Sequence, residues 1–215
     1  MKLTNQETVA ALDADFSEMA ILVGQHAWGI PDLTMREKAF VFVAADLSTH
    51  GLGFPLMTHV KMGMSQGVSL DSIREAVRHL APYVGYPTAA EALMRLAELD
   101  DASEQPPDSR RAASSDVDAA PLRRISGLDE DFARFLHDQF VQRWGRPDLT
   151  VRERALCTIA TDVLNGTLDE SFRLHVDLAL DHGAGMAQVR AVLLLLAEFG
   201  IAKVWRAFRA LGRIG

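Results

Sequence analysis

Cysteine is almost absent from this sequence, which has Cys157 as its one cysteine in 215 residues. A single cysteine excludes a disulfide within the chain and any Cys-x-x-Cys redox or zinc site. We interpret Cys157 as a small buried core residue, which is the usual environment of a free cysteine. A chain without disulfides is typical of a reducing compartment.

Long apolar runs and an excess of basic residues are missing as well. No apolar segment reaches the roughly 20 residues that a membrane span requires. Four acidic residues interrupt positions 7–18, so we expect no signal peptide and a cytoplasmic location. The formal net charge of −7 argues against a nucleic acid as the partner, because phosphate binding needs a basic surface.

Several cofactor signatures are also lacking. The sequence has no phosphate-binding loop and no dinucleotide-binding fingerprint. Its His, Asp and Glu residues show no convincing metal-ligand spacing. We therefore expect no cofactor and no metal, and a small molecule as the substrate.

What the chain does contain is a repeat. Residues 28–37 (WGIPDLTMRE) return as residues 144–153 (WGRPDLTVRE), an offset of 144 − 28 = 116 positions. The offset continues without a gap and indicates a duplicated small domain. We place the first unit at residues 1–99 and the second at residues 122–215. Residues 100–121, rich in proline, serine and charge, are predicted to be a flexible linker.

Helical periodicity runs through both units, and no segment alternates long enough for a strand, so the sequence predicts an all-α fold. Residues 4–28 are predicted as one opening helix with a capping box at 4–7. Further capping boxes at 34–37 and 150–153 begin the next helix of each unit. Ser69 is predicted to cap a helix with a buried stripe. The stripe and its copy are Leu70, Ile73, Val77 and Leu80, and Met186, Val189, Leu193 and Leu196.

The ordered set of motifs resembles the carboxymuconolactone decarboxylase and AhpD-like superfamily. The resemblance is carried by residues 31–37, the pair His59-Val60, the pair Gly67-Val68 and residues 80–87, and it returns more weakly over 144–197. It implies two tandem helical repeats related by pseudo-two-fold symmetry. It also implies trimers or hexamers with active sites between subunits, so we expect a homo-oligomer, either a trimer of tandem chains or a dimer.

The superfamily contains a redox branch, which has cysteines seven and four residues before a helix histidine. This chain has Leu52 and Pro55 at those positions in the first unit, and Leu168 and Ser171 in the second. Thiol chemistry needs a thiolate and a resolving partner. Neither unit supplies them, so we exclude a thiol peroxidase.

The other branch acts on lactone acids without a cofactor. Its members commonly have a glutamate four residues before the histidine and another carboxylate near the start of the second helix. Pro55 and Ser171 occupy the first position here, and Ala39 and Ala155 the second. These departures favour a substrate other than carboxymuconolactone.

His59 and His175 are the remaining candidates for catalysis. A recessed imidazole can move a proton and stabilise the charge that develops beside a carbonyl group. We predict a cofactor-independent lyase, either a decarboxylase or a related lactone- or keto-acid-isomerising enzyme, for a small carbonyl-bearing carboxylic acid or lactone. The alternative is a non-catalytic member that binds a small ligand or builds an oligomer. That alternative requires both histidines to be buried, bonded to the main chain and away from any cavity.

Four further residues are candidates for the substrate site. His50 lies in a glycine-rich turn, Tyr83 and Tyr86 offer phenol donors, and Trp28 is a possible pocket wall. Each also has a structural interpretation, as an exposed loop residue for His50 and as core packing for the others. If one unit alone is active we favour the first, because its residues 83–87 follow the family pattern.

Asp46 and Asp162 lie near the end of the second helix of their units. They either pair with Arg36 and Arg152 or orient the histidines. A salt bridge is the interpretation that we favour.

Overall fold

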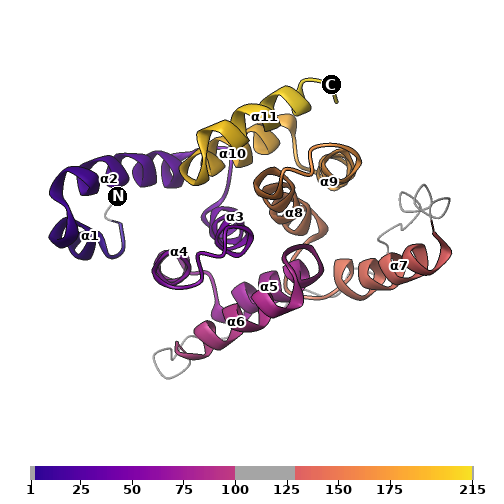
Figure 1. Ribbon diagram of the computed structural model, residues 1–215, viewed down its shortest axis with the longest axis horizontal. Coiled ribbons are helices and arrows are strands. Elements are labelled where there is room, and N and C mark those ends of the chain that lie inside the picture. The colour runs from indigo at the N-terminus through magenta and orange to yellow at the C-terminus, as the bar shows by residue number, and fades with distance from the viewer. Residues whose placement is uncertain (1–2, 100–128, 215) are drawn as a thin grey trace.

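The computed structural model describes residues 3–99 and 129–214, and these ranges contain helices and no strand (Figure 1). The predicted all-α fold is confirmed, while the predicted linker at 100–121 lies outside the described residues. The first unit comprises α1 (Gln6–Leu12), α2 (Ala14–Gly29), α3 (Met35–Ser48), α4 (Phe54–Ser65), α5 (Leu70–Val84) and α6 (Tyr86–Ala97). The second comprises α7 (Glu130–Trp144), α8 (Val151–Asn165), α9 (Glu170–Asp181), α10 (Met186–Leu195), the 3-10 helix η3 (Leu196–Phe199) and α11 (Ile201–Leu211). None of the described helices is long and apolar enough to cross a membrane.

The two units repeat the same succession of helices around a central pair. Helices α3 and α8 pack side by side in the middle, with α5 and α6 on one side and α10 and α11 on the other (Figure 1). Helices α2 and α7, which occupy equivalent positions in the two units, extend outward at opposite ends (Figure 1). The tandem repeats predicted from the offset are therefore present, in a pseudo-two-fold arrangement.

The central helices are buried on all sides. Every residue from Glu37 to Leu47 of α3 is buried, and so is every residue from Glu153 to Leu164 of α8. A helix that is apolar nearly all round belongs in the interior. Both predicted capping boxes are formed, with Thr34 and Thr150 accepting the N–H of their third helical residue. The two helices thus make up the common core of both units.

The capping glutamates also join the units to each other. Arg36 Nε lies 2.8 Å from Glu153 Oε1, and Arg152 Nη2 lies 2.8 Å from Glu37 Oε1. The two ion pairs are equivalent under the repeat offset, as expected for pseudo-two-fold contacts. The arginines therefore do not form the salt bridges that we favoured for the two aspartates.

A buried carboxylate provides a second link between the units. Glu75 of α5 accepts hydrogen bonds from Arg146 at 2.8 and 3.0 Å and from Arg154 at 3.1 Å. Burial by itself would raise the pKa of Glu75, but the two guanidinium groups outweigh it and lower the pKa. The Arg154 side chain is fully buried and also donates to the carbonyl groups of Arg146 and Pro147. Glu75 is thus the counter-charge that makes the burial of Arg154 tolerable.

The opening segment differs from the single helix that we predicted. It breaks at Asp13, whose extended backbone (φ −159°, ψ 117°) places its carboxylate to accept the Phe16 N–H at 2.7 Å and begin α2. Asn5 has a left-handed backbone (φ 63°) and makes no side-chain cap, so the capping box at 4–7 does not form. The apolar residues of this segment remain largely exposed, namely Leu12, Phe16, Met19 and Val23.

The helix after Gly67 follows the sequence prediction closely. The Ser69 side chain caps α5 by accepting the Ser72 N–H. The predicted stripe of α5 and its copy, which runs from α10 into η3, are buried except for Met186, which is partly buried and packs against the core.

We expect Glu75→Gln to lower the free energy of unfolding by about 3 kcal/mol, because it leaves the Arg154 guanidinium buried without a counter-charge. Urea denaturation followed by circular dichroism measures the loss. Glu98→Gln is the matched control, since the Arg95–Glu98 pair is about half exposed and we expect its loss to cost less than about 1 kcal/mol. Equal effects of the two substitutions would contradict the role given to Glu75.

Candidate active site

The first candidate site is built around His59 on α4. Its Nδ1–H donates to Asp46 Oδ2 at 2.8 Å, and Asp46, near the end of α3, is completely buried. A tight turn joins the two helices, and in it the Gly51 N–H donates to the Asp46 carbonyl oxygen at 2.8 Å. The turn reverses the chain direction, so the two side chains meet. Asp46 therefore orients the imidazole, which is the interpretation that we had ranked second.

Aromatic rings fix the plane of the His59 ring. Phe42 stacks on it with a centroid separation of 4.3 Å, and Trp28 stacks on Phe42 at 4.8 Å. Phe199 of η3 contacts the same imidazole at 5.9 Å from the second unit. With Nδ1 bonded and one ring face covered by Phe42, Nε2 is the nitrogen left for chemistry.

A carboxylate of the second unit lies in front of that nitrogen. Glu198 Oε1 of η3 is 3.8 Å from His59 Nε2, which is an ion-pair distance and longer than a direct hydrogen bond. Burial alone would lower the pKa of His59, but Asp46 and then Glu198 outweigh it and raise the pKa to about 9. Burial in turn raises the pKa of Asp46, and the neighbouring His59 opposes that rise. The His59 ring is therefore protonated at neutral pH.

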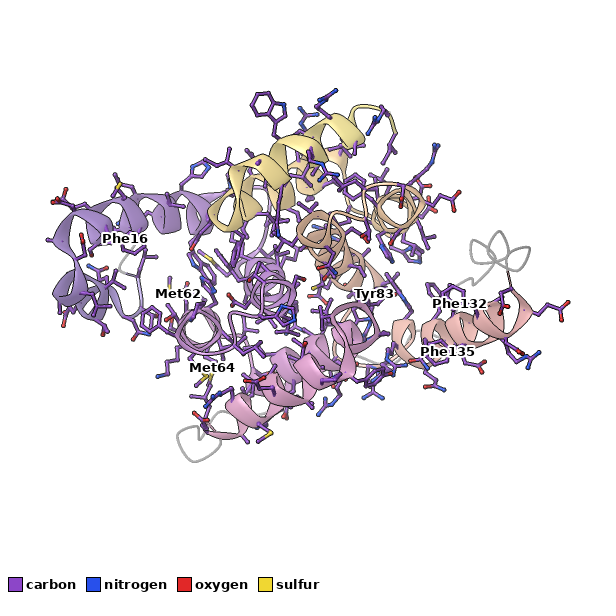
Figure 2. All side chains as sticks on the ribbon, viewed as in Figure 1. Phe16, Met62, Met64, Tyr83, Phe132 and Phe135 are labelled. Atoms are coloured by element: carbon purple, nitrogen blue, oxygen red, sulfur yellow. The ribbon has the colours of Figure 1, made fainter. Side chains whose placement is uncertain are left out.

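His59 and Glu198 line a pocket of about 330 Å³ between α2 and α4. Most of the wall is apolar, and among its described residues there is no lysine or arginine. Figure 2 shows two wall residues, Phe16 on the outlying α2 and Met62 on α4. The wall residues are Leu3, Thr4, Gln6, Val9, Phe16, Ser17, Ala20, Ile21, Gly24, Trp28, Phe54, Pro55, Thr58 and Met62. A small apolar molecule fits such a pocket with one end against the two ionisable groups.

The second histidine has the same carboxylate partner but different surroundings. His175 Nδ1 lies 2.6 Å from Asp162 Oδ2, and the other Asp162 oxygen accepts from Thr167 and Ser171. Trp144 stacks on the His175 ring at 5.8 Å, and Tyr83 meets it edge-on at 5.5 Å.

The ring of His175 is thereby enclosed. It is 2% exposed, and the indole Nε1–H of Trp144 donates to the Tyr83 hydroxyl at 3.0 Å beside it. The two equivalent histidines therefore have unequal access to small molecules.

Substitutions at equivalent positions explain the difference. Gly24 of the pocket wall corresponds to Phe140, whose buried ring stacks on Trp144 at 5.1 Å. Phe42 corresponds to Thr158, so that Trp144 reaches the histidine ring directly in the second unit, where Phe42 intervenes in the first. In the second unit, aromatic side chains fill the space beside the histidine that is open in the first unit.

The other predicted site residues are distributed over the molecule. Trp28 lines the His59 pocket, whereas Tyr83 lies beside His175 in the other unit's site. His50 is exposed in the turn after α3 with a left-handed backbone, φ 58°. Tyr86 lies in a separate groove of about 460 Å³, whose wall includes Arg143. The structure thus brings Trp28 and His59 together and separates the other three.

Sequence reasoning missed Glu198. The repeat offset pairs it with Pro82, so no repeated motif marks it. The aspartate–histidine pairs did leave a signal, because both units keep the same 13-residue spacing between the two residues.

Within the described part of the chain, no group of three or more His, Cys, Asp or Glu side chains is arranged to hold a metal ion. Cys157 is fully buried in α8, and burial raises the pKa of its thiol. This agrees with its interpretation as a core residue.

Comparison with known proteins agrees with this architecture. The profile of the carboxymuconolactone decarboxylase family matches residues 14–99 and again residues 130–212, so the chain belongs to that family and contains its domain twice. A solved structure from Burkholderia xenovorans, named as a candidate gamma-carboxymuconolactone decarboxylase subunit, has a TM-score of 0.55 and 18% sequence identity to this chain. The similarity covers 97% of this chain and 91% of that one, and at such identity it shows a shared fold. A search of curated proteins found no match.

Titration of the His59 ring by NMR tests the electrostatics of this site. We expect a midpoint near pH 9, and we expect Asp46→Asn to lower it by at least about one unit, because the burial cost then lacks its main compensation. Asp162→Asn, the equivalent change in the other unit, should leave the His59 titration unchanged. A midpoint near 6.5 in the unsubstituted protein would contradict the proposed coupling.

Proposed function

We propose that the chain is a cofactor-independent lyase or isomerase for a small carbonyl-bearing carboxylic acid or lactone, with His59 as its acid–base group. The observation that carries the proposal is that His59 presents Nε2 to an apolar pocket while Asp46 holds Nδ1. Family membership supports it, because the family is named for the decarboxylation of a lactone acid. An oriented, recessed proton donor next to a ligand-sized space is what acid–base catalysis requires.

His59 would act by stabilising charge on a carbonyl oxygen. Loss of CO2 or of a proton beside a carbonyl group leaves an electron pair that is delocalised onto that oxygen. The protonated His59 donates its Nε2–H to the oxygen, and the Asp46 carboxylate offsets the cation behind it. Because the Phe42 and Phe199 rings contact the imidazole, the donor is oriented before the substrate arrives.

The non-catalytic alternative required both histidines to be bonded to the main chain and remote from cavities. His175 is enclosed, but its Nδ1 is bonded to a carboxylate. His59 departs from the alternative in both respects. The contrast favours a single working site for each chain, in the first unit.

Matched glutamine variants test the roles of the two histidines. A panel of β-keto acids, unsaturated lactone acids and their esters is incubated in D2O. Proton NMR then detects both loss of CO2 and exchange of hydrogen beside the carbonyl group. We expect His59→Gln to lower kcat/KM at least about 100-fold. His175→Gln should stay within about threefold, since its ring is enclosed.

The same assay has a pH signature. The donor is protonated His59, so the rate holds at neutral pH and falls as the pH rises through about 9. Circular dichroism verifies that the His59→Gln variant is folded. Unchanged turnover by the folded variant would overturn the acid–base role of His59.

The outlying helices support a homo-oligomer, either a trimer of tandem chains or a dimer, as a further part of the proposal. Helix α2 exposes Phe16, Met19 and Leu22, and α7 exposes Phe132 and Phe135 (Figure 2). Apolar side chains gathered on projecting helices are typical of subunit contacts. The Burkholderia protein is itself named as a subunit.

We expect the double substitution Phe132→Ser, Phe135→Ser to reduce the molar mass measured by light scattering after size exclusion. Met94→Ser is the control, because Met94 is exposed and belongs to α6, which is neither of the outlying helices. A monomeric mass for the unsubstituted chain would refute the assembly.

A further inference from the structure

The His59 pocket has an electrostatic character that bears on its substrate. Three ionisable groups meet at the pocket wall, Asp46 from α3 behind His59 from α4, and Glu198 from η3. His59 and Asp46 together share one proton and sum to zero wherever that proton resides. Glu198 adds a second carboxyl group, so the acidic side chains of this cluster outnumber its one imidazole.

Apart from His59, the described wall contains no basic side chain. The remaining wall is apolar apart from the neutral side chains of Thr4, Gln6, Ser17 and Thr58. Sites that bind a carboxylate in water-poor surroundings ordinarily supply an arginine or a lysine. A carboxylate seated here would instead lie near Glu198 in a medium of low effective dielectric constant, where like charges repel strongly.

Glu198 is also placed to take part in the chemistry. Its Oε1 lies 3.8 Å from His59 Nε2, so a proton donor and a proton acceptor face the same small volume. An acid and a base that face one carbonyl compound are the arrangement found where that compound is enolised. The equivalent position in the first unit is Pro82, which offers neither function.

We propose that the substrate of this pocket is an uncharged apolar carbonyl compound, such as a neutral unsaturated lactone or enone, and that Glu198 is both the group that rejects carboxylates and the catalytic base. This inference rests on the proposed function and narrows it to isomerisation by proton transfer. The second unit then completes the active site of the first, since Glu198 belongs to η3.

The proton-transfer step balances without an added reactant. The Glu198 carboxylate removes a proton from the carbon beside the carbonyl group, and that C–H electron pair forms the new C=C bond. The carbonyl π pair takes the proton from His59 Nε2, which gives a neutral enol, a neutral imidazole and a protonated Glu198. Return of the proton from Glu198 to the far carbon of the dienol, with the enol proton going back to His59, completes an isomerisation and restores both groups.

The test uses an unsaturated γ-lactone that carries an acetate side chain, together with its methyl ester. The two probes differ in charge and little in shape. Calorimetry gives Kd for each, and NMR in D2O gives hydrogen exchange beside the carbonyl group. The unsubstituted chain should bind the ester at least tenfold more tightly than the acid. Glu198→Gln should bring the two Kd values within about threefold, mainly by improving the binding of the acid.

Exchange of the ester separates catalysis from binding. In Glu198→Gln we expect exchange to fall at least 100-fold while Kd for the ester changes less than about threefold, because glutamine keeps the shape and removes the base. Glu98→Gln, on the exposed face, should match the unsubstituted chain in both measurements. Gly24→Phe, which copies Phe140 into the pocket wall, should abolish binding of both probes.

Each outcome bears on one claim. Equal binding of acid and ester by the unsubstituted chain, or release of CO2 from the acid, overturns the uncharged substrate class. Unchanged exchange in Glu198→Gln overturns the role of Glu198 as the base. If His59→Gln leaves hydrogen exchange unchanged, the proposed function itself fails. The preference for the ester over the acid is measured as Kd without turnover, so it is judged separately.

Discussion

The packing of α3 against α8 is the constraint on which the rest of the structure depends. Nearly every residue of each helix is buried, because each is covered by the other unit as well as by its own. Charged groups at this junction are therefore paired across it, Arg36 with Glu153 and Arg152 with Glu37. These pairs fix the register of the two units, and in that register η3 of the second unit lies against His59 of the first.

The same contact gives a reason for the fusion of two units in one chain. The candidate site takes Asp46 and His59 from one unit and Glu198 and Phe199 from the other. With both units in one chain, the groups at equivalent places can differ, as Glu198 differs from Pro82. One site can then keep its pocket while the other gains aromatic packing around His175, which adds buried apolar area to a unit of about 100 residues.

Retention of the Asp162–His175 pair in the enclosed site has a structural explanation. Asp162 accepts from Thr167, Ser171 and His175, and so ties the end of α8 to the start of α9. Removal of one partner would leave a buried polar group unsatisfied, which is costly. A pair that arose with the catalytic unit thus persists where its ring has no access to a ligand, and matched histidines in the two units are weak evidence for two active sites.

The sequence by itself determined the helical class, the duplication, the capping boxes at Thr34 and Thr150 and the two histidines, because periodicity, caps and repeats are local properties of the chain. It also placed Asp46 near His59 without deciding its partner, since a 13-residue spacing spans a turn whose geometry no local rule fixes. The break at Asp13, the exposed face of α2, the opening beside Gly24 and the arrival of Glu198 were decided only by the tertiary structure. Each depends on which surface of one unit the other covers, and that is set by long-range packing.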